Sequence, residues 1–414
     1  MTKKSSTPAI RFKGFTDTWE QRKLGDIVER VVRKNTNNES SLPLTISAQY
    51  GLVDQITYFN NRVASRDVSN YYLVLNGEFA YNKSTSDGFP FGAVKRLDLY
   101  EKGVLSTLYI VFSIKNQSEI DSDYLTVFFD TDRWHKGVSE RAAEGARNHG
   151  LLNISADDFF DIDIFLPRHK EEQVAIGSYL RHLDNLITLH QRKYDKLTNV
   201  KKSMLEKMFP KNGSNVPEIR FKGFTEAWEQ RKLCDVVKEI TRNDPESEAP
   251  IMMITANNGF IEQSERYAFN NAGESLKKYI LLKKGELAYN HGASKLRPYG
   301  SCFALTTAEN ARIPFVYHCF SAENQNAEFM SIELNGAEIE NQLRKIVSSG
   351  ARMDGLLNIS FDEYTSVSVL LPGIEEQDCI ADFFRQLDNL ITLHQRELEK
   401  LKNLKKACLE KMFV

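Results

Sequence analysis

Two short loops hold the side chains in this sequence that are best suited to binding a charged ligand. Each follows a predicted strand and mixes amide, hydroxyl and basic groups, which are the side chains that contact base edges and phosphates in nucleic acids. The candidates are Asn82, Lys83, Ser84, Thr85, Lys95 and Arg96 in and beyond the first loop, Asn290, His291, Ser294, Lys295 and Arg297 in the second, and Arg147 and Arg352 in two matching Gly-Ala-Arg turns. Each loop is also compatible with an ordinary solvated turn, and each of the two matching arginines could equally bond a backbone carbonyl.

The sequence contains no recognisable catalytic signature. It has no GxxxxGK[ST] phosphate loop, no GxGxxG, no HExxH, no GxSxG and no Asn-Pro-Pro-aromatic string. The eight histidines are scattered, and the five cysteines are odd in number and form no CxxC pair. We therefore expect no catalytic residue, no metal site and no disulfide framework.

Composition places the chain among folded proteins without a membrane span. Of its 414 residues 41% are hydrophobic, but no apolar run approaches the roughly 18 to 20 residues of a membrane helix. The basic, Ser/Thr-rich start at residues 1–9 is not followed by an apolar stretch, so we expect no secretory signal and a cytoplasmic location. Because the formal net charge is only −2, any nucleic-acid binding must depend on local patches or on a partner subunit.

The whole sequence is a tandem duplication. Recurring strings are Ile10–Thr16 at Ile219–Thr225, Trp19–Leu24 at Trp228–Leu233, Gly77–Asn82 at Gly285–Asn290, Gly145–Ser155 at Gly350–Ser360, and Leu183–Arg192 at Leu387–Arg396. A period this long makes each copy a whole domain rather than a solenoid unit. Between the strings, residues 40–72 and 248–279 share little beyond an apolar rhythm. Either surface loops have drifted, or the recurring frame serves assembly while the inserts perform two versions of one recognition task.

Within each copy the apolar periodicity predicts a mixed α and β domain. The predicted strands are 72–81, 107–114, 160–166, 280–289, 315–320 and 366–371, and the predicted helices are 123–133, 325–334 and 337–347. Ser155 with Asp158, and Ser360 with Glu363, are typical of a helix N-cap followed by an acidic residue.

Each copy ends in a sustained heptad pattern after a proline. The seam positions include Ile176, Leu180, Leu183, Ile187, His190 and Leu197 in the first copy, and Ile380, Phe384, Leu387, Ile391, His394, Leu398 and Leu401 in the second. A helix of about 37 residues would span roughly 55 Å, too long to bury its seam against one small domain. We expect the two helices to pair antiparallel as an intramolecular coiled coil, about a pseudo-two-fold axis.

Polar residues interrupt this predicted seam at matching positions. His190 and His394 favour a register-setting role over a metal or pH-sensing one. Lys201 and Lys405 are expected to extend out of the seam into solvent.

The order of these motifs resembles the DNA-specificity subunit of Type I restriction-modification enzymes over essentially the whole chain, twice. The resemblance rests on the Trp-Glu-Gln-Arg-Lys-Leu openings, the Gly-Glu-Phe/Leu-Ala-Tyr-Asn strands, the Gly-Leu-Leu-Asn-Ile-Ser turns, the Glu-Glu-Gln helix starts and the Leu-Asp-Asn-Leu-Ile helices. One departure is Asn290-His291-Gly292 in the second copy, where the first has Asn82-Lys83-Ser84.

The resemblance implies an α+β chain with two target-recognition domains, at residues 1–168 and 210–372, and two long antiparallel helices, at 169–209 and 373–414. Each domain would read one half of a bipartite double-stranded DNA target. The helices would set the spacer and dock two modification subunits, and separate restriction subunits would cut unmodified DNA. S-adenosylmethionine, ATP and magnesium would act on those partners, and this chain would hold no cofactor. Two alternatives remain: a coiled-coil adaptor without DNA reading, and an enzyme with a degenerate site that acts alone.

Overall fold

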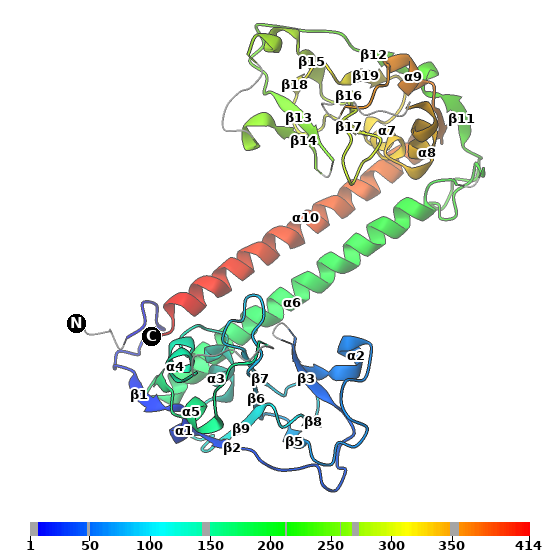
Figure 1. The fold of residues 1–414 in the computed structure, drawn as a ribbon. Coiled ribbons are helices and arrows are strands. Elements are labelled where there is room, and N and C mark those ends of the chain that lie inside the picture. The colour runs from blue at the N-terminus through cyan, green and yellow to red at the C-terminus, as the bar shows by residue number, and fades with distance from the viewer. Residues whose placement is uncertain are drawn as a thin grey trace. The chain divides into compact units, whose positions relative to one another are not determined.

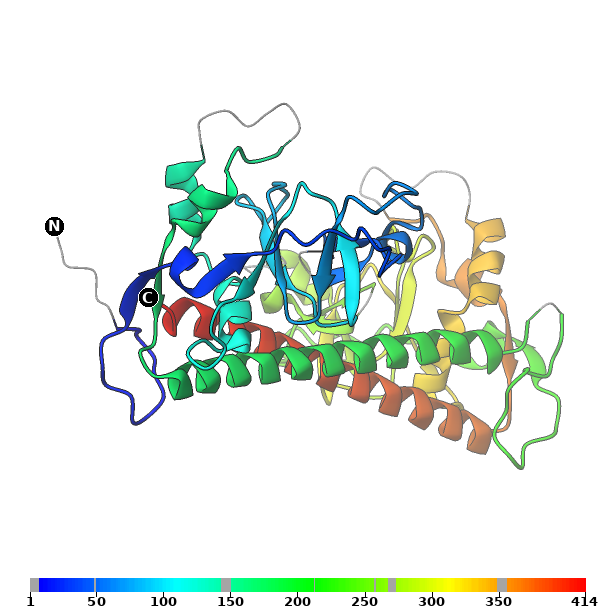
Figure 2. The ribbon, with the colours of Figure 1, turned by 90° about the horizontal axis from the view of Figure 1, so that it is seen from below.

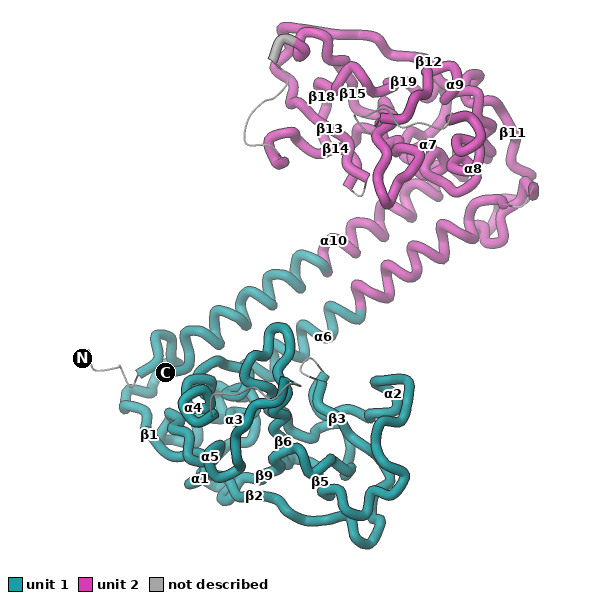
Figure 3. The backbone as a smooth tube through the Cα atoms, viewed as in Figure 1, with its two compact units in different colours: residues 1–192, 395–414 teal, residues 193–394 magenta. Residues whose placement is uncertain are grey.

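The computed structural model describes residues 7–47, 50–142, 150–211, 213–256, 258–266, 273–347 and 356–414. The chain divides into two compact units (Figure 3). Unit 1 contains residues 1–192 and 395–414, and unit 2 contains residues 193–394. Within the described ranges, no helix is long and apolar enough to cross a membrane.

Unit 1 is built on short antiparallel strands (Figure 1). They are β1 (Glu20–Lys23), β2 (Val28–Arg30), β3 (Leu44–Ser47), β4 (Gly51–Asp54), β5 (Tyr72–Leu75), β6 (Phe79–Asn82), β7 (Ala93–Arg96), β8 (Lys102–Leu105), β9 (Ile110–Ile114) and β10 (Asp163–Leu166). The central sheet has the order β2-β9-β6-β7, and β1-β10, β3-β4 and β5-β8 form separate pairs. The short helices are α1 (Leu24–Ile27), α2 (Gln55–Phe59), α3 (Ser122–Phe128), α4 (His135–Arg141) and α5 (Ala156–Phe160).

Unit 2 repeats this topology strand for strand. Its strands are β11 (Glu229–Lys232), β12 (Val237–Glu239), β13 (Met252–Thr255), β14 (Gly259–Glu262), β15 (Ile280–Lys283), β16 (Leu287–Asn290), β17 (Ser301–Ala304), β18 (Asn310–Ile313), β19 (His318–Ala322) and β20 (Ser368–Leu371). The central order is β12-β19-β16-β17, with pairs β11-β20, β13-β14 and β15-β18. The helices are α7 (Ala327–Leu334), α8 (Ala337–Ile346) and α9 (Phe361–Thr365), with 3-10 turns η1 (Leu233–Asp235), η2 (Gln263–Glu265) and η3 (Gly273–Lys278).

The two long predicted strands are each broken in two. Gly77 has a φ of +85° and Gly285 a φ of +83°, so each ends one strand in a turn that an L-residue with a side chain rarely adopts. The chain then enters β6 or β16, which belongs to a different sheet from β5 or β15. The predicted continuous strands 72–81 and 280–289 are therefore wrong, because their apolar rhythm crosses a glycine turn unbroken.

Two 38-residue helices link the units, α6 (Lys170–Lys207) and α10 (Ile374–Lys411). In unit 1 the first part of α6 runs antiparallel to the last part of α10, because Lys405 contacts Asp184 while Cys408 lies by Tyr179 (Figures 1 and 2). In unit 2 the rest of α6 lies antiparallel to the start of α10. The predicted fold class is confirmed: mixed α and β domains with two long helices that pack antiparallel.

Each domain core includes the far end of the other copy's helix. In unit 1, Met412 and Phe413 from the end of α10 pack with Trp19. In unit 2, Met208 and Phe209 from the end of α6 pack with Trp228 in the same way. The core of each unit therefore needs side chains from both copies of the repeat.

Candidate nucleic-acid interface

The recurring strings bond to each other inside each unit. The Nε and Nη2 groups of Arg11 donate to the two carboxylate oxygens of Glu172 at 2.5 and 2.7 Å. Arg220 donates to Glu376 in the same two-pronged way at 2.7 and 2.6 Å. The carboxylate side chains are 0% and 1% exposed. These Arg-Phe and Glu-Glu-Gln strings therefore hold the domain onto its helix and are not available to a ligand.

The glutamine of the same helix start has a matching structural role. The Oε1 atom of Gln173 accepts from the backbone N–H of Asp121 at 2.9 Å, while its Nε2 donates to the carbonyl of Pro167 at 3.1 Å. Gln377 makes the equivalent bonds in unit 2, at 3.0 and 2.9 Å, to the N-cap of α7 and the proline after β20. Both glutamines are buried, so they anchor α3 or α7 to the start of the long helix.

The first asparagine of each predicted binding loop shapes its own backbone. The Oδ1 atom of Asn82 accepts from the N–H of Ser84 at 3.0 Å, and that of Asn290 accepts from the N–H of Gly292 at 2.9 Å. Both asparagines are half-buried. The same turn thus follows β6 and β16, whatever residue stands at the third position.

The rest of the first loop packs onto the turn that carries the Leu-Leu-Asn-Ile-Ser string. Thr85 donates its N–H and its Oγ1 to the carbonyl of Gly150 at 2.7 and 2.9 Å. The Nζ of Lys83 lies 3.2 Å from the carbonyl oxygen of Ile154. Beyond Thr85, residues 86–90 are all exposed. The tip is thus the most exposed part of this loop, and the candidates Asn82 to Thr85 are half-buried.

The second loop has one buried and two exposed candidates. His291 is 9% exposed, and its two ring nitrogens lie 2.9 and 2.7 Å from the carbonyl oxygens of Leu357 and Val316. It therefore turns inward, as Lys83 does in unit 1, although the side chains differ. Ser294 and Lys295 are exposed at the tip of the loop.

The basic candidates on β7 form internal ion pairs. Lys95 contacts Asp130 at 2.7 Å. Arg96 contacts Asp98 at 2.5 Å and Asp123 at 2.7 Å, and its side chain is 10% exposed. These charges are largely neutralised within unit 1.

Of the remaining three arginine candidates, only Arg297 lies within the described residues. The Nη1 of Arg297 donates to the carbonyl of Asn335 at 2.8 Å, and burial lowers the pKa of this guanidinium despite the opposing charge of Glu340. Arg147 and Arg352 lie outside the described residues.

The predicted seam positions are buried or half-buried throughout α6 and α10. Those fully buried are Ile176, Leu180, Leu183, Ile380, Phe384, Leu387 and Leu398, and those half-buried are Ile187, His190, Leu197, Ile391, His394 and Leu401.

The expectation that the two seam lysines extend into solvent is wrong for Lys405, whereas the side chain of Lys201 is 32% exposed. Lys405 is 19% exposed and contacts Asp184 at 2.7 Å and Asp130 at 3.3 Å. Lys201 contacts Asp388 at 2.5 Å. Each ammonium group forms an ion pair with a carboxylate on the other long helix.

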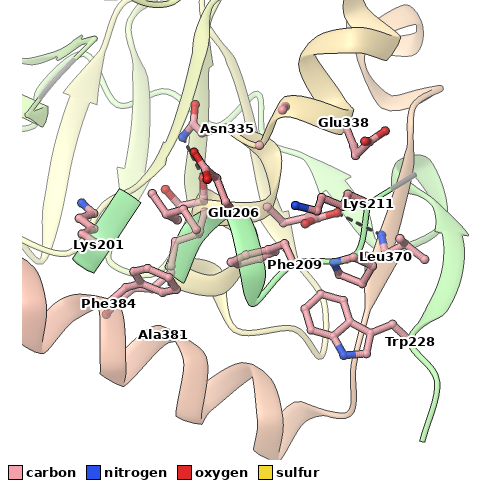
Figure 4. A pocket seen from close by; sticks show the side chains of 18 of the residues that line it. Lys201, Glu206, Phe209, Lys211, Trp228, Asn335, Glu338, Leu370, Ala381 and Phe384 are labelled. Carbon is pink, nitrogen blue, oxygen red and sulfur yellow. Dashed lines mark hydrogen bonds between the residues drawn. The ribbon is translucent and has the colours of Figure 1, made fainter. Parts of the chain in front are cut away.

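Unit 2 contains a cleft of about 1060 Å³ that borders the end of α6 and the start of α10 (Figure 4). Lys201, Phe209, Trp228 and Asn335 line it, together with the buried carboxyl group of Glu333. The equivalent positions in unit 1 carry the buried ring of Phe128, in place of Glu333, and the cluster formed by Lys95, Asp130 and Lys405. The two copies thus differ in polarity where the domain meets the paired helices.

Residues 56–63 of unit 1, which no sequence pattern singled out, are exposed without interruption. Four of these residues are large and apolar. An apolar rhythm alone does not reveal this, because the same residues in a buried segment would give the same pattern.

The comparisons with known proteins agree with this architecture. Residues 16–199 match the Type I restriction modification DNA specificity domain. The chain is 24% identical over 422 residues to the Type I restriction enzyme MjaVIII specificity subunit of Methanocaldococcus jannaschii, covering 94% of this chain and 91% of that protein. It is 22% identical, with the same coverage, to a putative Type I restriction enzyme MjaX specificity subunit of that organism. The crystal structure of a Type-I restriction-modification system S subunit from M. genitalium superposes with a TM-score of 0.56 at 13% identity, over 99% of both chains.

Proposed function

This chain belongs to the Type I restriction-modification DNA specificity family, and from that premise we propose that it selects the DNA target of such a system. Each copy reads one half of a bipartite double-stranded sequence. The matched family is a specificity domain and not a catalytic one, so the chain supplies recognition and its partner subunits supply the chemistry. We propose that this DNA recognition takes place in the cytoplasm, where a bacterial or archaeal chromosome is accessible.

One observation carries the proposal: the two copies keep a bonded internal frame while the segments outside it differ. Buried Arg-Glu pairs, and buried glutamines that bond to the N-cap residues of α3 and α7, recur at matching positions. The inserts between residues 40 and 72 and between 248 and 279 do not recur in the same way. This is the pattern expected when one scaffold must read two different half-sequences.

The reading surface belongs to the domains at 1–168 and 210–372, and the helices at 169–209 and 373–414 set the distance between half-sites. Of the predicted contact residues, Ser294 and Lys295 are the ones whose side chains are exposed at a loop tip. The exposed faces of the helices are proposed to dock two methyltransferase subunits, with restriction subunits joining that assembly.

The test is to sequence the methylome of cells that express this chain with its cognate modification subunit, and of matched cells without this chain. A split adenine-methylation motif that appears only with the chain supports the proposal and gives both half-sites at once. No motif, with the same modification subunit shown to be active beside another specificity chain, would favour an adaptor role instead.

A further inference from the structure

Unit 1 carries an exposed segment that its core does not explain. Residues 56–63 span most of α2 and the turn after it, and all of them are exposed. The large apolar residues among them are Ile56, Tyr58, Phe59 and Val63, which are 39%, 47%, 50% and 66% exposed. Folding offers no reason to hold four such side chains in water on one short segment, so a binding role is the better explanation.

The segment is held firmly although it is exposed. The Oδ1 of Asp54 caps α2 by accepting from the N–H of Ile56 at 2.9 Å, and Asn60 ends the helix with a φ of +50°. The Oε1 of Gln55 accepts from the N–H of Ala64 at 2.6 Å, which closes the loop behind the helix. Figure 1 shows α2 next to β3 at the margin of unit 1. The aromatic rings are therefore presented on a fixed support, which lowers the entropic cost of binding.

Its polar residues suit a polyanion. No carboxylate lies between Asp54 and Asp67, which flank the segment, and Arg62, Arg66, Asn60 and Asn61 are all exposed. Arg62 donates to backbone carbonyls at 3.3 and 3.0 Å, which positions its charge without neutralising it. Arginine and asparagine side chains contact the phosphates and sugars of a duplex, and exposed rings beside them add apolar contact area in a groove.

Part of this segment also recurs in the second copy, inside the inserts that otherwise diverge. Tyr58-Phe59-Asn60-Asn61 has its counterpart in Tyr267-Ala-Phe269-Asn270-Asn271 of the sequence, after strands that match in order. The left-handed backbone of Asn60 accounts for one of these residues in unit 1, but not for the exposed aromatic rings. A string kept in both copies cannot distinguish two different half-sequences. Its aromatic and amide residues suit what the half-sites share, which is the duplex itself. The two arginines belong to the first copy alone, since Ala272, Gly273 and Glu274 follow Asn271 in the second.

We propose that residues 56–66 hold duplex DNA without selecting its sequence, with Tyr58 and Phe59 packed against the sugars and base edges of a groove and Arg62 and Arg66 against phosphates. The inference rests on the proposed function and adds a division of labour to it. The base-selective contacts lie elsewhere in unit 1, and this segment raises affinity for every duplex alike.

The experiment uses the complex of the full chain with its modification subunits. Two short duplexes are compared, one with the motif found by methylome sequencing and one with a scrambled sequence. Phe59→Ala is expected to weaken binding of both by about tenfold to a hundredfold, leaving their ratio unchanged, because the complex no longer buries the phenyl ring. Arg66→Gln is expected to reduce the slope of log K against log salt by about one for both. The control is Leu108→Ala, another exposed apolar residue of unit 1, at 66% against 50% for Phe59, which is expected to change neither affinity.

Three results would overturn the inference. Phe59→Ala could match the Leu108→Ala control, or it could weaken only the specific duplex, which would make the segment a base reader. It could also prevent the complex from assembling without DNA, which would make the segment a protein-docking face. A wild-type complex that binds both duplexes equally contradicts the proposed function instead, while the comparison of Phe59→Ala with Leu108→Ala still decides the inference.

Discussion

Glu376 is a buried carboxylate whose charge is balanced by a single guanidinium, that of Arg220. Removing one partner of a buried ion pair leaves the other charge in a site from which water is excluded. We expect Glu376→Gln to lower the free energy of unfolding by about 3 kcal/mol or more, measured by urea denaturation followed by circular dichroism.

A matched control for this substitution exists in the same unit. Glu309 pairs with Lys284 at 2.7 Å, but the two side chains are 79% and 54% exposed. Because solvent screens an exposed pair, Glu309→Gln is expected to cost well under about 1 kcal/mol. Equal losses in the two variants would show that burial of the Glu376 pair does not matter to stability.

The buried carboxyl group of Glu333 is expected to make the stability of unit 2 depend on pH. Burial raises the pKa of this carboxyl group to about 7 from its ordinary value of 4.5. Between those values the folded chain binds the proton more tightly than the unfolded chain, so the free energy of unfolding falls as the pH rises. Glu333→Gln keeps an oxygen to accept from the N–H of Leu370, which lies 3.2 Å from the carboxylate, and removes the titration.

We therefore expect Glu333→Gln to match the wild type near pH 4 and to exceed its stability by up to about 3 kcal/mol near pH 8. Denaturation curves across this range measure the difference. A difference that is constant with pH would mean that the carboxyl group does not titrate in the cleft.

At the scale of elements, the sequence predicts best where periodicity is long and uninterrupted. The heptads of α6 and α10 are correct to within a few residues because a seam repeated over many turns leaves one interpretation. The capping boxes at Ser155 and Ser360 are confirmed, since each hydroxyl accepts from the N–H three residues on. The strand pairs β3-β4 and β13-β14 were not predicted, because four-residue strands give too little alternation to recognise.

The candidate site was harder to predict than the elements. Loop composition picked out polar residues correctly, but it could not show that Lys95 and Arg96 meet carboxylates from distant segments. Those partners lie 27 to 35 residues away in sequence, and only the folded chain brings them together. Whether a side chain is exposed to a ligand or bonded inside the domain depends on the tertiary fold, so the local sequence does not reveal it.

The proposed function makes the paired helices an element with its own test. Inserting four residues, about one turn or roughly 6 Å, into both α6 and α10 adds a stutter that a coiled coil tolerates. We expect the methylated motif to keep both half-sequences and to gain a longer spacer, as measured by methylome sequencing. A changed half-sequence with an unchanged spacer would show that the helices do not set the distance between the half-sites.

At the scale of the whole molecule, the duplication makes the two ends of the chain equivalent to an internal junction. The N–H of Ile219 donates to the carbonyl of Lys207 at 2.9 Å, just after α6. The N–H of Ile10 donates to the carbonyl of Lys411 at 2.9 Å, just after α10. In unit 2 the two bonded residues belong to one continuous stretch of backbone. In unit 1 the same bond joins Ile10 and Lys411, which lie far apart in the sequence.

This equivalence predicts that the chain tolerates circular permutation. A variant that begins at Gly213, continues through Val414 and a short flexible linker into Thr7, and ends at Lys211 would retain every hydrogen bond named above. Thr7, Lys211 and Gly213 are exposed, whereas Met412 and Phe413 are buried and Val414 is half-buried. The linker therefore starts beyond Val414, and the new ends at Lys211 and Gly213 need no buried partners. We expect the permuted chain to unfold at nearly the same urea concentration as the wild type and to direct methylation to the same motif.

The necessary control removes the contact on which the argument depends. Deleting residues 408–414 takes Cys408, Met412 and Phe413 out of the core of unit 1, where the ring of Phe413 lies 6.3 Å from that of Trp19. This deletion is expected to destabilise unit 1 and to abolish methylation, because an unfilled core loses several buried side chains at once. A permuted chain as unstable as the deletion would mean that the order of segments, and not their packing, determines whether unit 1 folds.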